Sequence, residues 1–389
     1  MKLLGCCVGL AVGFLAACSG KYDMGSEPMG GAAGAAPSAG TGNETEGGSS
    51  GIGGSGSGPV AGSAPVAGAA PVAGSAPVGG SGPVVMPRCD YGVISMAPST
   101  SLASSAELAE RVYRFLDASP APTQLTLPPV PSAAWVVELA DEILDGHADS
   151  DSPALGLERF LLNWLPEIPQ DAPATAAPAW AKKLTAADAT LATLISEPTG
   201  EPHRFGIVTE PDVLGSKTRI SARGDWMMKS LLCNPVPDAP ANLPPFNPTP
   251  PQGQTFRQHL AVSVQNPSCA ACHHLLDPMG YALEHFDEQG NYRTLDNGLP
   301  VDASGTMVSP SLSFTDYASL APQLAESCEV AACVSKLVFT DALKAGFGNP
   351  NVPLSEGEVN SVASQFSESD FEIRTLVHAI VTTPSFLRQ

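Results

Sequence analysis

Two cysteines and a histidine form the one pattern in this chain that predicts a specific chemistry. Cys269 and Cys272 are separated by two alanines and His273 follows directly, so the segment reads Cys-Ala-Ala-Cys-His. Two thiols at this spacing can form thioether bonds to the two vinyl groups of a haem, and the next histidine then lies under the iron. The pattern therefore predicts one covalently attached c-type haem per chain, with His273 as its proximal ligand.

Three other interpretations of the same residues remain open. Cys269 and Cys272 could form a redox disulfide, although the βαβ pattern typical of thioredoxin-like proteins is missing and His273 has no role in it. They could bind zinc together with His274 or His285, but the sequence contains no second Cys-X-X-Cys. They could also be a structural remnant that binds no cofactor.

The second axial ligand of the iron is less clear from the sequence. Met307 lies well downstream of His273, where the distal methionine of c-type sites often occurs, and is our candidate. His274, His285 and an iron with no distal ligand are the alternatives. Met279 is too close to His273 in the chain to reach the opposite face of a haem, so we expect it to pack in the core.

Charged residues are concentrated after the motif. Arg293 could pair with a haem propionate, since guanidinium and carboxylate match in geometry, or form a salt bridge with Asp287 or Asp302. The aspartates of this region do not have the spacing of an EF-hand, so we expect turn caps and surface charge rather than a calcium site. They are Asp277, Asp287, Asp296 and Asp302.

Four further cysteines are candidates for disulfides if the chain is exported. Cys328 and Cys333 are close in sequence and form the natural local pair, which leaves Cys89 to pair with Cys233 by elimination.

The N-terminus predicts export. After Met1 and Lys2, residues 3–17 form an apolar run that is too short for a comfortable membrane span and is typical of a signal peptide. Its end, Leu-Ala-Ala-Cys, resembles a bacterial lipobox, which implies lipidation of Cys18 and anchoring to a bacterial membrane. A plain secretory peptide is the alternative. Ser19 in place of aspartate favours the outer membrane or cell surface over the inner membrane, by analogy.

Residues 18–87 consist almost entirely of Gly, Ala, Pro, Ser and Val, with a repeated PVAGSA unit, and predict a disordered tether. The whole chain carries 39 Asp and Glu against 19 Lys and Arg, a net charge of -20. Such an excess excludes nucleic acid as a partner, because binding it needs a basic surface. An acidic surface instead suits a basic redox partner protein.

The remaining chain is expected to be mainly α-helical with one small β-hairpin. Ser104 and Glu107 predict a capping box at the start of a helix, and Asn297-Gly298 predicts the hairpin turn. We expect Asp370 to be the N-cap of the last helix and His378 to face solvent. Further helices are predicted over 134–146, 155–165, 185–195 and 255–264, and at three places between 313 and 368.

Two longer segments resemble the planctomycete cytochrome C-type multidomain proteins. One begins at Arg204, and the other runs from Asn266 to Gly305. In the second segment the Cys-X-X-Cys-His motif is followed by Asp277-Pro278-Met279-Gly280, Glu284-His285-Phe286-Asp287, Gly290-Asn291-Tyr292-Arg293 and Asp302-Ala303-Ser304-Gly305. Residues 104–165 and 313–389 resemble other domains of these proteins more weakly.

The resemblance implies a cytochrome c-like helical domain over residues 201–311. It is expected to lie between an abbreviated helical domain, 88–200, and a C-terminal helical domain, 312–389. We expect one-electron transfer or redox sensing rather than catalysis, since no distal acid–base residue indicates peroxidase action at an open iron. The alternative is a haem-free tethered binding or scaffold module in which the two cysteines form a disulfide or a metal clip.

Overall fold

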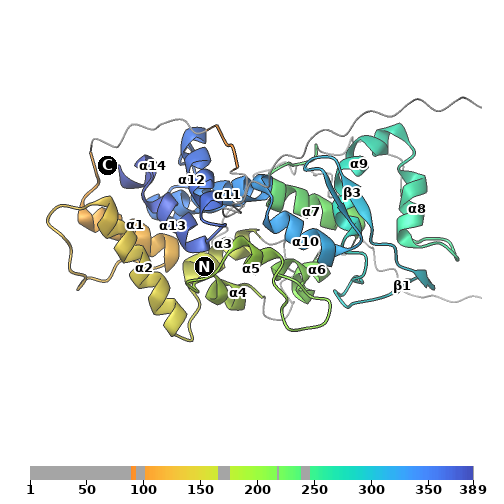
Figure 1. Cartoon of the computed structure of the whole chain (residues 1–389), viewed down its shortest axis with the longest axis horizontal. Helices are drawn as coiled ribbons and strands as arrows, with labels where there is room; N and C mark the ends of the chain where they lie inside the picture. Colours follow the sequence, from red (N-terminus) through yellow and green to blue (C-terminus); the bar gives the residue numbers. More distant parts are fainter. Residues whose placement is uncertain (1–88, 93–100, 165–175, 217–218, 238–245, 389) are drawn as a thin grey trace, which may run out of the picture. The chain divides into compact units, whose positions relative to one another are not determined.

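The computed structural model describes residues 89–92, 101–164, 176–216, 219–237 and 246–388. Within these ranges the chain is mainly α-helical and contains two small antiparallel hairpins (Figure 1), so the prediction of a mainly α fold is confirmed. The predicted signal peptide, Cys18 and the tether lie outside the described residues. None of the described helices is long and apolar enough to cross a membrane.

The helices share one hydrophobic core, to which all three predicted regions of the folded part contribute. In chain order the elements before the first hairpin are α1 (Ser105–Leu116), α2 (Ala133–Asp149), α3 (Leu155–Trp164), α4 (Ala177–Leu184), α5 (Leu191–Ile195), the 3-10 helix η1 (Ile207–Thr209), α6 (Pro211–Ser216), α7 (Ile220–Leu232), α8 (Phe256–Ser263) and α9 (Pro267–Tyr281). After the hairpins come α10 (Tyr317–Ala325), α11 (Cys328–Phe347), α12 (Glu356–Glu368), α13 (Ile373–Val381) and α14 (Pro384–Leu387).

Helix α1 begins where the sequence predicts. Ser104 Oγ accepts a hydrogen bond from the backbone N–H of Glu107 at 3.3 Å, and the Glu107 carboxylate accepts one from the N–H of Ser104 at 2.9 Å. This capping box satisfies both backbone groups. Leu108, Val112 and Phe115 follow at helical spacing and are fully buried, so the amphipathic pattern of the sequence places α1 in the core.

The helix predicted over 185–195 is wrong in its first half. The chain turns after α4, and Thr190 adopts an extended conformation that caps the short α5. Thr190 forms an isolated antiparallel bridge with Glu372, and the N–H of Leu191 donates to the carbonyl of Phe371 at 2.9 Å. Pairing with this distant backbone overrides the local helical preference.

Helices α7 and α9 lie side by side (Figure 1) and pack very closely, because glycine occupies both contact points. A Cβ atom on Gly224 of α7 would lie 1.9 Å from the carbonyl oxygen of Leu276. A Cβ atom on Gly280 of α9 would lie 2.0 Å from the carbonyl oxygen of Ile220. Any side chain at either position would push the two helices apart, since a packed interior has no space to absorb it.

The hairpin predicted at Asn297-Gly298 is confirmed. Strands β1 (Leu295–Asp296) and β2 (Leu299–Pro300) pair on either side of these two residues, whose φ angles are 49° and 81°. Two consecutive positive φ angles are typical of the tight turns that match the twist of a hairpin. A second hairpin, β3 (Gly305–Met307) with β4 (Leu312–Phe314), was not predicted, and it packs against α9 through β3.

The predicted N-cap of the last long helix is wrong. Glu372 rather than Asp370 precedes α13. Asp370 and Phe371 have φ angles of 54° and 61°, and the N–H of Phe371 donates to the carbonyl of Phe366 at 3.0 Å. Both residues therefore belong to the turn that ends α12, where a left-handed conformation satisfies the last carbonyl groups of a helix.

His378 on α13 does not face solvent as predicted. Its Nε2 lies 2.8 Å from Oδ1 of Asp141 on α2, and its side chain is only 30 % exposed. Arg374, one turn earlier, bonds the same carboxylate at 2.9 Å. The polar side of α13 therefore packs against another helix, which the pattern of a single helix cannot reveal.

All four disulfide candidates are bridged, but the predicted pairing is wrong. Cys89 pairs with Cys328, and Cys233 pairs with Cys333, with Cα atoms 5.6 Å and 5.2 Å apart. Cys328 and Cys333 both belong to α11, where a separation of five residues places them on different faces and about 7.5 Å apart along the axis. A disulfide needs a closer approach than this, so each cysteine is bridged to another segment.

The close packing of α7 and α9 can be tested with one methyl group. We expect Gly224→Ala to lower the free energy of unfolding by about 3 kcal/mol, because its Cβ would overlap the backbone of α9. Gly146→Ala in α2 is the control, since no atom lies within 4 Å of its Cβ and alanine favours a helix over glycine by up to about 1 kcal/mol. Urea unfolding of the full chain measures both, and equal effects would contradict the proposed packing.

The disulfide pairing can be tested by mass spectrometry of peptides from the non-reduced protein. We expect linked peptides that contain Cys89 with Cys328 and Cys233 with Cys333. Removing the second bridge in a Cys233→Ala/Cys333→Ala variant is expected to lower the free energy of unfolding by about 2–4 kcal/mol, because the unfolded chain loses its cross-link. A linked peptide that joins Cys328 to Cys333 would show that the pairing described above is incorrect.

Candidate functional site

The Cys-X-X-Cys-His motif lies in the first two turns of α9. Asn266 caps this helix by accepting a hydrogen bond from the N–H of Ser268 at 3.0 Å. Proline at position 267 suits the first helical turn, where its missing N–H would have no partner inside the helix. Cys269 and Cys272 are half-buried and neither is in a disulfide, unlike the other four described cysteines. The helix thus presents two reduced thiols about one turn apart.

His273 is oriented by a buried carboxylate. Its Nδ1 lies 3.0 Å from both carboxylate oxygens of Asp277, one turn further along α9. The Asp277 side chain is 2 % exposed, whereas that of His273 is 28 % exposed. Among the described residues no group bonds Nε2, so the nitrogen that a metal would need is left open. Holding one ring nitrogen in this way fixes which nitrogen is available as a ligand.

A serine from α7 completes this arrangement. Ser221 Oγ donates to Oδ1 of Asp277 at 2.7 Å and lies 3.3 Å from Nδ1 of His273. Ser221 lies one helical turn before Gly224 on α7. Because α7 and α9 approach closely at that glycine, Ser221 is near enough to bond the Asp277 carboxylate. The three side chains do not form a hydrolytic triad, because serine and aspartate meet at the same ring nitrogen instead of at opposite ones.

The donor set fits the proximal side of a c-type haem. Two reduced thiols precede a histidine whose Nδ1 is anchored and whose Nε2 is open, which is what covalent attachment and axial ligation require. No cluster of three or more His, Cys, Asp or Glu side chains suited to a metal ion occurs in the part of the chain that the structure describes.

The predicted distal candidates lie in different surroundings. Met307 is 7 % exposed in β3 and belongs to the hydrophobic core, so its role as distal ligand remains a prediction. Met279 is fully buried, which confirms its expected packing role. His285 bonds the carbonyl of Arg293 through Nδ1 at 2.9 Å, whereas His274 is exposed on α9.

Arg293 forms a salt bridge, but with partners other than those predicted. Its Nη1 lies 2.7 Å from Oδ1 of Asp296, and its Nη2 lies 3.5 Å from Oε2 of Glu284. Neither Asp287 nor Asp302 takes part. The guanidinium therefore has carboxylate partners within the fold, and the predicted contact with a haem propionate remains a prediction.

Of the four aspartates of this region, Asp296 is the salt-bridge partner of Arg293, and the other three divide into two groups. Asp287 and Asp302 cap turns as predicted: Asp287 accepts from the N–H of Asn291 at 2.8 Å, and Asp302 from the N–H of Ser304 at 3.1 Å. Asp277 does not cap a turn, because its side chain is buried beneath His273. Its spacing of four residues from that histidine on one helix was the signal that could have identified it.

Arg223 is a buried charge that the sequence did not single out. Its guanidinium donates to the carbonyl groups of Leu283, Phe286 and Asp287 at 3.0, 2.7 and 2.6 Å. Burial lowers the pKa of Arg223 to about 10, so the group is still charged at neutral pH. It ties α7 to the turn that follows α9, and thereby holds the end of the helix that carries the motif.

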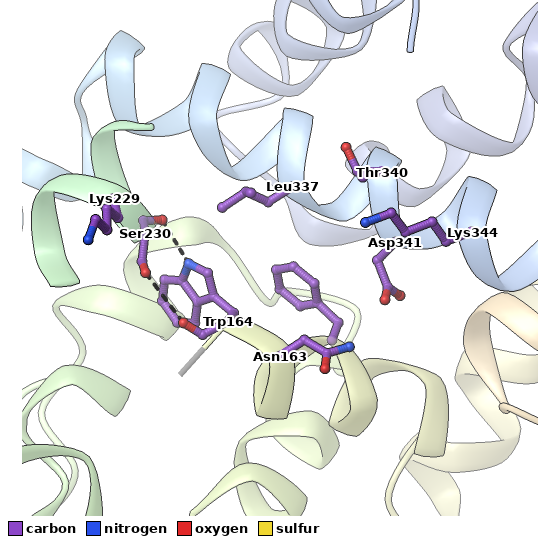
Figure 2. A pocket seen from close by; sticks show the side chains of 9 residues that line it. Asn163, Trp164, Lys229, Ser230, Leu337, Thr340, Asp341 and Lys344 are labelled. Atoms are coloured by element: carbon purple, nitrogen blue, oxygen red, sulfur yellow. Dashed lines mark hydrogen bonds between the residues drawn. The ribbon is translucent and has the colours of Figure 1, made fainter. Parts of the chain in front are cut away.

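A separate hollow of about 380 Å³ lies between α3, α7 and α11 (Figure 2). Trp164 forms one wall and donates from Nε1 to the carbonyl of Ser230 at 2.7 Å. Lys229 and Lys344 contribute cations to its lining, and Lys229 and Asp341 are each engaged in an ion pair. None of the lining residues belongs to the Cys-X-X-Cys-His motif, so the hollow is not part of the candidate site.

Comparison with known proteins supports the resemblance over part of the chain. Residues 204–296 match the family model PSCyt3, described as a protein of unknown function (DUF1588), the planctomycete cytochrome C-type domain family. This range contains α7, α9 and the motif. No curated protein and no solved structure matches the chain.

The buried Glu284 predicts a pH dependence of stability. Burial raises the pKa of Glu284 to about 7, against an ordinary value of 4.5. Between these two values the folded protein keeps a proton that the unfolded chain loses, so stability is expected to fall as the pH rises through this window. Glu284→Gln should flatten the dependence in urea unfolding at several pH values.

The exposed Glu138 on α2 provides the control for this measurement. Glu138→Gln is expected to keep the pH dependence of the unmodified protein. If Glu284→Gln also kept it, the buried carboxyl group would not be its source.

Proposed function

We propose that this chain carries one c-type haem, bound covalently through Cys269 and Cys272 with His273 as proximal ligand, and acts in one-electron transfer or redox sensing. The observation that carries this proposal is the orientation of His273. A buried carboxylate holds Nδ1, Nε2 is left open, and two reduced thiols precede the ring on the same helix.

The protein's own groups would attach and orient the cofactor. Cys269 and Cys272 would hold the haem through their thiols, His273 Nε2 would ligate its iron, and Asp277 with Ser221 would keep the ring from rotating. The haem supplies a one-electron couple between ferric and ferrous iron. The family region that contains the motif has a cytochrome C-type name, which supports this assignment.

The remaining parts of the proposal concern the setting of the site. Lipidation at Cys18 would anchor the chain to a bacterial membrane, with the outer membrane or cell surface favoured, and the tether would hold the folded part away from it. The net charge of -20 favours docking of a basic redox protein, with an affinity that falls as salt is added.

A haem-free binding or scaffold module is the second candidate. Cys269 and Cys272 lie near the N-terminus of a helix with two residues between them, which is also the arrangement of redox-active disulfides. In that case His273 would serve only to order the helix, and the cysteines would form a disulfide or a metal clip.

The pyridine haemochrome spectrum of the full chain separates the two candidates. We expect a c-type spectrum that survives denaturation when the protein is exported from a host with cytochrome c maturation machinery. Cys269→Ser/Cys272→Ser should abolish it, because no thioether can form. His274→Ala, a change of the exposed neighbouring histidine, should retain it.

Absence of haem from the unmodified chain under these conditions would exclude the electron-transfer proposal. Thiol counting and metal analysis on the same sample would then identify the disulfide or the metal clip.

A further inference from the structure

We propose that Asp277 lowers the reduction potential of the haem by giving His273 partial imidazolate character. This inference rests on the proposed function, and it assigns Asp277 and Ser221 as residues that act on the iron through the histidine. No bond of the protein forms or breaks in the step concerned: one electron from an external redox protein converts ferric to ferrous iron.

The Nδ1 atom of His273 lies within hydrogen-bond distance of a charged acceptor. Both oxygens of Asp277 lie 3.0 Å from this nitrogen. A carboxylate accepts more strongly than a backbone carbonyl, because it carries a full charge. With a side chain only 2 % exposed, the charge is screened little by water, so its effect on the ring is correspondingly large.

Among the residues that the structure describes, no arginine or lysine forms a salt bridge with Asp277. Among the described residues its hydrogen-bond partners are His273 and Ser221, and neither carries a permanent charge. A buried carboxylate without an arginine or lysine partner depends on the hydrogen bonds that it receives. The His273 ring is therefore its principal electrostatic partner, and Ser221 shares the negative charge through Oδ1.

The hydrogen bond between Asp277 and His273 affects the reduction potential of the haem iron. A carboxylate that attracts the Nδ1 proton makes the other ring nitrogen a more basic ligand. A more basic axial ligand stabilises ferric iron relative to ferrous iron, which lowers the potential. Ser221 opposes this effect, because its hydrogen bond withdraws part of the negative charge from the carboxylate.

The two residues therefore predict shifts of opposite sign. Asp277→Asn keeps a hydrogen-bond acceptor but removes the charge, so the potential should rise, with the ferrous form favoured at least tenfold more, about 59 mV for one electron. Ser221→Ala leaves the carboxylate without its donor, so the potential should fall. Asp145→Asn on α2 removes an equal charge from a side chain that is 64 % exposed and should leave the potential unchanged.

Spectroelectrochemical titration of the haem-loaded full chain measures all three variants against the unmodified protein. Opposite shifts support the proposal, because loosened packing alone would move both variants in the same direction. If Asp277→Asn does not load haem, the Ser221→Ala variant alone tests the proposal. A reduction potential that rises or stays the same in Ser221→Ala would overturn it. Haem loading with no shift in either variant would overturn this inference and leave the proposed function intact, whereas an unmodified chain without haem would overturn both.

Discussion

The candidate site depends on the contact between α7 and α9 through Gly224 and Gly280. A Cβ atom at either glycine would overlap the backbone of the other helix. Only at this separation can Ser221 reach Asp277, and only then is the carboxylate covered by α7. The close packing of α7 and α9 therefore supports the carboxylate that orients His273, and the Cys-X-X-Cys-His motif by itself does not include that carboxylate.

Buried charges hold the segment after the motif. Arg223 donates to carbonyl groups in the turn that ends α9, and Glu284 lies nearby with Arg293 as its ion-pair partner. Burying such groups is unfavourable unless each has a partner. Their presence indicates that the turn and the first hairpin are held in one arrangement relative to α7, so that α9 is fixed at its C-terminal end as well as along its length.

The two disulfides join segments that are far apart in the sequence to α11. Cys233 at the end of α7 is bridged to α11, and Cys89 is bridged to the first residue of α11. The hydroxyl of Tyr91 also donates to the carbonyl of Cys328 at 2.9 Å. The first described residues after the predicted tether are therefore fixed to the C-terminal helices. This leaves Cys269 and Cys272 as the described thiols that can take part in other chemistry.

The sequence by itself determined the local features. The capping box at Ser104, the turn at Asn297-Gly298 and the helical spacing of α1 depend on neighbouring residues, and the structure confirms them. The motif and its family region could be recognised for the same reason, because attachment of a haem needs only a few consecutive residues.

Tertiary structure decided every feature that depends on residues far apart in the chain. The pairing of the cysteines, the extended backbone at Thr190 and the partner of His378 all involve segments that local patterns do not connect. Asp277 shows both contributions, because its spacing of four residues from His273 on one helix is a local signal, whereas the burial of its side chain is not. Its side chain is buried because α7 covers it, and at 2 % exposure its charge is screened little by water.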